Sequence, residues 1–153
     1  GRAIRARLPG AVVCEQGCPA LVPLIEAGTT DGPAVREALA GYLAPLLAEQ
    51  VDTIVYGCTH YPFLDRAVSA LAGPGVSRVD PAVALVARAA EDLGRQGALA
   101  PARTQPDRFV VSGSPDHFRA VGSLFLQRTL PPVEQVNIEG YGTAGAGTNT
   151  AVK

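Results

Sequence analysis

The sequence lacks methionine and tryptophan, and its only lysine is Lys153. Enzymes that use pyridoxal phosphate hold this cofactor as a Schiff base on a rigidly placed lysine. A lysine at the end of a Gly/Thr/Ala-rich tail therefore nearly excludes that chemistry. The chain also opens on Gly1 instead of methionine, so we expect a processed or truncated product and not a complete translated protein.

The sequence also lacks an excess of charge and a long apolar run. Its 13 basic and 14 acidic residues give a net charge of −1, which removes the electrostatic case for nucleic acid or a membrane surface as a partner. No apolar run approaches the about 18 residues of a spanning helix, and the apolar stretch after Arg2–Arg7 is too short for a signal peptide. Three cysteines are too few for a disulfide framework, so we expect a cytoplasmic location.

What is present is the composition and pattern of a globular α/β chain. Its 153 residues are 47% apolar and 18% charged, which fits one or two compact units. Buried strands are expected at residues 11–14, 53–56, 76–79, 109–112 and 133–138, and they alternate with amphipathic helices at 19–27, 33–47, 62–71, 81–93 and 114–127. This alternation predicts an α/β fold with a parallel sheet and crossover helices. We expect a linker at residues 97–107 and a disordered tail at 139–153.

The most informative segment is Gly-Cys-Thr-His-Tyr-Pro at residues 57–62. It stands where an apolar strand ends and a helix begins, which is the sheet edge at which open α/β folds bind ligands. The backbone N–H groups at the start of that helix favour a thiolate at Cys58. His60 can serve as its acid/base or orienting partner, and the hydroxyl of Thr59 suits a substrate carboxylate or amine. The alternative is that Cys58 is a small buried residue and His60 a turn histidine.

Glu26 is a carboxylate within the otherwise apolar segment at residues 23–28. A carboxylate that hydrogen-bonds His60 would tune its basicity and complete a Cys–His–acid set. The alternative is an ordinary surface glutamate.

The other candidate ligands form no convincing metal site. Cys14 and Cys18 lie four residues apart, and only His60 and His117 could add ligands, so we expect buried apolar thiols and no metal. His117 follows the cap sequence Ser-Pro-Asp, and we expect it to be an exposed first-turn residue.

Residues 57–62 resemble the second cysteine motif of the bacterial glutamate racemases. Further segments resemble this family in the expected order: Cys18–Gly28, Val79–Ala82 and Ser112–Phe118. Aspartate and hydantoin racemases share the Gly-Cys-Thr core, but the His-Tyr-Pro that follows it favours the glutamate branch. By this resemblance the chain is identified as the carboxyl-terminal portion of a glutamate racemase, with similarity extending to about residue 138.

The resemblance implies a racemase that needs no cofactor, interconverts L- and D-glutamate and supplies D-glutamate for peptidoglycan. In such enzymes one cysteine thiolate removes the α-proton, and a second cysteine protonates the opposite face. Carried over to this sequence, Cys58 acts on L-glutamate, His60 assists it, Glu26 is the acidic partner and Thr59 helps to hold the substrate. The resemblance also implies a cytoplasmic homo-dimer.

Two α/β domains related by pseudo-symmetry are implied for the complete protein. Residues 1–80 would form the second domain, and residues 81–138 would return to complete the first. The family's first catalytic cysteine, in a Cys-Asn-Thr setting, has no counterpart in this sequence. We therefore expect the isolated chain not to racemise glutamate, and we expect exposed apolar faces beyond Pro81.

Three other functions stay open at this point. The first is a related racemase that acts on aspartate or a hydantoin. The second is a non-catalytic interaction module, because some glutamate racemases bind and inhibit DNA gyrase. With a net charge of −1, such a module would bind the gyrase protein and not its DNA. The third is an α/β domain with an inert thiol.

Overall fold

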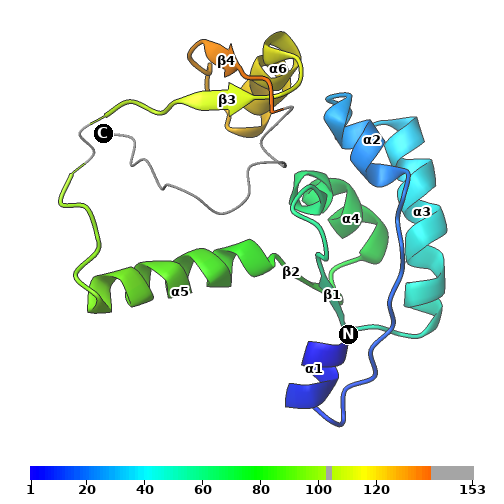
Figure 1. The fold of residues 1–153 in the computed structure, drawn as a ribbon. Helices are drawn as coiled ribbons and strands as arrows, with labels where there is room; N and C mark the ends of the chain where they lie inside the picture. Colours follow the sequence, from blue (N-terminus) through cyan, green and yellow to red (C-terminus); the bar gives the residue numbers. More distant parts are fainter. Residues whose placement is uncertain (103–104, 139–153) are drawn as a thin grey trace. The chain divides into compact units, whose positions relative to one another are not determined.

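A computed structural model describes residues 1–102 and 105–138 of the chain. The chain divides into two compact units, Gly1–Ala102 and Arg103–Lys153. The first unit has helices around a pair of short parallel strands, and the described part of the second has one helix between two such strands (Figure 1), which is the predicted α/β class. The expected tail at 139–153, including Lys153, lies outside the described residues.

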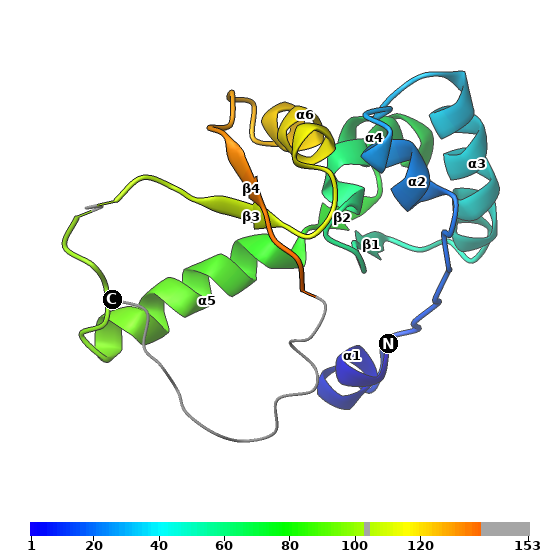
Figure 2. The ribbon, with the colours of Figure 1, turned by 45° about the horizontal axis from the view of Figure 1, so that its top comes forward.

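The first unit consists of helices around one strand pair. Its elements are α1 (Arg2–Arg7), α2 (Leu21–Glu26), α3 (Pro33–Ala48), β1 (Thr53–Val55), the 3-10 helix η1 (Tyr61–Leu64), α4 (Asp65–Ala72), β2 (Ser77–Val79) and α5 (Pro81–Arg95). Strands β1 and β2 are parallel, with Thr53 opposite Ser77 and Val55 opposite Val79. Since parallel neighbours need a crossover connection, η1 and α4 lead from one strand to the other (Figure 2).

The core of this unit is formed where α3 packs against α2 and α4. Helix α3 buries Val35, Leu39 and Leu43, which recur every four residues and so share one face of the helix. The partners of this face on the neighbouring elements are also apolar and buried: Leu21, Ile25, Leu64, Ala67 and Val68. This packing fixes the end of α2 and the turn η1, which flank the segment at residues 57–60.

The strand expected at residues 11–14 is not formed. Within the described part of the chain these residues join no ladder. A groove of about 1340 Å³ is lined by residues 10–18, by β1 and by α3, and in the described residues β1 pairs only with β2. A strand needs a neighbour for its backbone groups, and this run has none beside it.

Helix α5 begins where the sequence predicts and has no buried residue. Asp80 caps it by accepting a hydrogen bond of 2.9 Å from the backbone N–H of Ala82, and Pro81 fits the first turn. Val83, Leu85 and Val86 are all exposed. The exposed apolar residues expected beyond Pro81 are therefore observed on this helix.

The second unit contains β3 (Phe109–Val111), α6 (Pro115–Phe125) and β4 (Val133–Gln135). Strands β3 and β4 are parallel, with Phe109 opposite Val133. Ser114 caps α6 by accepting a hydrogen bond of 3.3 Å from the N–H of His117. His117 is exposed in the first turn, as expected. No helix within the described residues has the length and apolar character needed to cross a membrane.

Candidate active site

The candidate site is the loop that follows β1. Tyr56 is the last buried residue of this segment, at 6% exposure. The loop then carries Cys58, Thr59 and His60 at the carboxyl end of the strand, before η1 begins at Tyr61. The strand–loop–helix junction predicted from the sequence is therefore present, with a 3-10 turn preceding the α-helix.

Three side chains predicted from the sequence lie in a row at this loop. The Sγ atom of Cys58 is 3.6 Å from Nδ1 of His60, and Nε2 of His60 is 2.6 Å from Oε1 of Glu26. The imidazole therefore has a thiol at one nitrogen and a carboxylate at the other. This row is partly open to solvent, since the side chains of His60 and Glu26 are 28% and 44% exposed.

The folding of α2 brings Glu26 to the loop although 34 positions separate it from His60. Leu21 and Ile25 face the core, and the helix stops at Glu26, where Gly28 adopts a positive φ of 77° and donates its N–H to the carbonyl of Ile25. A helix C-terminus favours a cation over a carboxylate. The contact with His60 compensates for this placement whenever the imidazole is charged.

The arrangement can move a proton between the thiol and the imidazole. When Nε2–H donates to Glu26, Nδ1 is the free acceptor that faces Cys58. Transfer of the thiol proton to Nδ1 gives a thiolate and an imidazolium, and the carboxylate stabilises that imidazolium. Thr59 lies between Cys58 and His60 in the sequence and is exposed, so its hydroxyl is accessible to a ligand.

The other two cysteines have different surroundings. Cys14 is exposed, so the expectation that it is a buried thiol was wrong, because the segment at 11–14 has no strand to cover it. Cys18 is half-buried and shares a hydrogen bond with Tyr61, and burial raises the pKa of its thiol. Burial also raises the pKa of the Tyr61 phenol, and Cys18 and Cys58 nearby add to this. Among the described residues, no three His, Cys, Asp or Glu side chains are grouped to hold a metal.

Sequence reasoning missed a polar network beneath the loop. The hydroxyl of Tyr56 donates a hydrogen bond of 2.6 Å to Oδ1 of Asp65, and Nε of Arg78 donates one of 2.8 Å to the same oxygen. The hydrogen bond from Tyr56 is the main cause of a lowered pKa of Asp65, with Arg78 adding to it. Burial and the Asp65 hydrogen bond raise the pKa of Tyr56. The place of Arg78 in this network depends on the register of β1 and β2, for which the sequence carried no signal.

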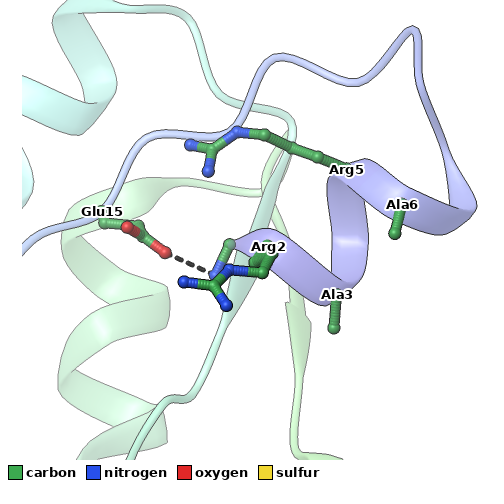
Figure 3. A pocket seen from close by; sticks show the side chains of 6 residues that line it. Arg2, Ala3, Arg5, Ala6 and Glu15 are labelled. Carbon is green, nitrogen blue, oxygen red and sulfur yellow. Dashed lines mark ion pairs between the residues drawn. The ribbon is translucent and has the colours of Figure 1, made fainter.

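Two hollows of the described residues do not include the row. The groove along β1 and α3 is lined by Cys18 and Tyr61 among others. A smaller hollow of about 690 Å³ adjoins α1, and there the Glu15 carboxylate pairs with the amino group of Gly1 (Figure 3). Neither is lined by Cys58, His60 or Glu26.

Curated proteins similar to this chain are named glutamate racemases. The one from Syntrophus aciditrophicus is 43% identical over 138 residues, which cover 90% of this chain and 51% of the relative. The one from Neisseria meningitidis is 40% identical over 138 residues with the same coverage. The chain thus spans about half the length of the curated relatives it matches. No protein-family model matches the sequence.

Solved structures of glutamate racemases share the fold. The enzyme from Francisella tularensis, in complex with D-glutamate, has a TM-score of 0.82 at 26% identity, and the match covers 92% of this chain and 52% of that one. A racemase isoform from Bacillus anthracis has a TM-score of 0.81 at 26% identity, covering 90% of this chain and 51% of that one. The α/β architecture expected from the sequence is therefore the architecture of this part of known racemases.

Proposed function

We propose that this chain, a partial homologue of glutamate racemases, carries one of the two proton-transfer thiols of such an enzyme. The observation that supports this most is the row formed by Cys58, His60 and Glu26, with distances of 3.6 and 2.6 Å. A thiol beside an imidazole is a good acid/base at neutral pH, and racemisation needs such a group on each face of the substrate.

Each side chain has a stated task in the proposed reaction. The Cys58 thiolate removes the α-proton of L-glutamate, which forms the S–H bond and leaves the electron pair on the α-carbon. A thiol on the opposite face then donates its proton to that carbon. Before the next cycle His60 takes the proton from Cys58 and releases it to solvent, and the thiolate on the opposite face regains a proton from solvent. Glu26 stabilises the charged imidazole, and Thr59 holds the substrate.

The substrate is proposed to be glutamate. The relatives are named for this amino acid, and the Francisella tularensis structure holds D-glutamate. We propose further that the complete enzyme supplies D-glutamate for peptidoglycan without pyridoxal phosphate, in the cytoplasm and as a homo-dimer. Residues 1–152 of this chain contain no lysine that could hold pyridoxal phosphate as a Schiff base.

The isolated chain is proposed not to racemise glutamate. Within the described residues, Cys58 is the thiol that has a histidine beside it, whereas Cys14 is exposed and Cys18 contacts Tyr61. One activated thiol exchanges a proton on one face only. Appearance of D-glutamate from L-glutamate with the purified chain, abolished in Cys58→Ala, would overturn this part of the proposal.

Alkylation of the three cysteines tests the proposed roles. The chain is treated with a limiting amount of iodoacetamide, and each cysteine peptide is quantified by mass spectrometry. We expect Cys58 to react fastest, His60→Ala and Glu26→Gln to slow it about tenfold and threefold, and L-glutamate to protect it. The matched control is Glu49→Gln, which changes an exposed glutamate at the end of α3.

Two results of this experiment would contradict the proposal. Alkylation of Cys58 at an ordinary rate, unaffected by His60→Ala and by L-glutamate, indicates an inert thiol. Protection by L-aspartate at lower concentration than by L-glutamate indicates the related racemase with another substrate.

A further inference from the structure

The loop that carries Cys58 and His60 is tied at both ends by side chains outside the proton-transfer row. It begins after Tyr56 and leads through η1 to Asp65, the first residue of α4. The Tyr56 hydroxyl donates to the Asp65 carboxylate over 2.6 Å. This single bond therefore links two residues nine positions apart and closes the base of the loop.

The second strand braces the same carboxylate. Arg78 lies on β2 beside Ile54 of β1, and its Nε donates to Oδ1 of Asp65 over 2.8 Å. Its Nη1 also donates to the carbonyl of Val76 over 3.4 Å. The guanidinium is thus held both by Asp65 and by the residue that precedes its own strand.

The backbone completes this bracing. The N–H of Tyr56 donates to the carbonyl of Val79 over 3.0 Å, which extends the β1–β2 ladder by one step to the edge of the loop. Tyr56 is buried, with 6% of its surface exposed. Both the main chain and the side chain of the residue two positions before Cys58 are therefore fixed.

We infer that Tyr56, Asp65 and Arg78 are positioning residues that hold the Cys58 loop in its reactive shape. The hydrogen bonds of these side chains lie at the two ends of the loop, where they set the direction of the chain. The separation of Cys58 and His60 is 3.6 Å, a distance at which a small shift of the loop ends the contact. This inference rests on the proposed function, because it assigns the network a task in maintaining that contact.

The test measures Cys58 alkylation relative to Cys14 in the same molecule. Cys14 is exposed and distant in sequence from the loop. Its alkylation rate therefore reports differences in reagent and solution conditions that do not involve the loop. Tyr56→Phe removes only the hydroxyl, and we expect the Cys58:Cys14 rate ratio to fall about three- to tenfold, toward that of His60→Ala, because misplaced reacting groups lose rate steeply. Thermal unfolding of each variant is measured alongside, and alkylation is done well below the midpoint.

A matched control distinguishes loss of the Arg78–Asp65 pair from the general effect of breaking an arginine–aspartate pair. Arg78→Gln breaks the pair with Asp65, and Arg36→Gln breaks the 3.0 Å pair with Asp31 at the start of α3. We expect the first to lower the ratio and the second to leave it unchanged. Should Arg78→Gln fail to fold, Tyr56→Phe decides alone.

Two results have distinct meanings. If His60→Ala slows Cys58 but Tyr56→Phe leaves the ratio unchanged while lowering the unfolding midpoint, the network only stabilises the unit and the inference is overturned. If His60→Ala itself leaves Cys58 unaffected, the proposed proton-transfer row is wrong, and the positioning inference is overturned with it.

Discussion

Leu64→Ala is expected to cost far more stability than the same change at Leu85. Leu64 is 1% exposed at the junction of η1 and α4, whereas Leu85 is 68% exposed on α5. The substitution removes three carbons, and at about 0.8 kcal/mol per buried CH₂ this amounts to about 2.4 kcal/mol. The cavity left behind raises the loss to about 3–4 kcal/mol. At Leu85 we expect a change within about 0.5 kcal/mol.

Urea unfolding followed by circular dichroism at 222 nm measures both variants. A fall in midpoint for Leu64→Ala with an unchanged slope is the expected pattern. The reasoning is refuted if the two variants lose equal stability, because burial would then not distinguish the positions. It is also refuted if Leu85→Ala is the more damaging change, which would place α5 in a core and not on the surface.

Three further predictions concern titration and capping. The hydrogen bond from Tyr56 lowers the pKa of Asp65. The ionised Asp65 therefore stabilises the fold above its usual pKa of 3.8, and this contribution is lost as the pH falls through the folded pKa. The difference in unfolding midpoint between wild type and Asp65→Asn should shrink in acid. A difference that grows in acid would contradict this sign. Burial raises the pKa of Cys18, so its alkylation should be slow at pH 7 and accelerate above pH 9; fast reaction at pH 7 would disprove it. Asp80→Ala removes the 2.9 Å cap of α5 and should cost about 1 kcal/mol of helix stability, seen as lower helicity; unchanged helicity would show that the cap is dispensable.

Local signals in the sequence were enough to place most helices. Asp80 with Pro81, and Ser114 with Pro115, mark helix starts because a capping side chain and a fixed φ act within one turn. On α3, Val35, Leu39 and Leu43 recur every four residues, which is the spacing of one helical face. These features depend on neighbours in the chain, so the sequence contains them.

Pairing between distant segments was harder to predict. The apolar run at 11–14 has strand composition, yet whether it forms a ladder depends on which strand lies beside it. The contact of Arg78 with Asp65 depends on the register of β1 against β2, which no local pattern specifies.

The candidate site combined both kinds of information. Cys58 and His60 are two residues apart, so their proximity follows from the loop itself. Glu26 lies 34 positions away from His60, and it was proposed as a partner because a carboxylate in an apolar segment is unusual and because the resemblance assigns it that place. Cys14 was misjudged because its burial depends on a strand partner.

The central claim is that Cys58 exchanges the α-proton of glutamate with the help of His60. The most direct measurement incubates the purified chain with L-glutamate in deuterated water and follows the α-hydrogen signal by proton NMR. The account predicts a slow loss of that signal without formation of D-glutamate, absent in Cys58→Ala and slower with L-aspartate. No loss of signal, or a loss that persists in Cys58→Ala, would contradict it.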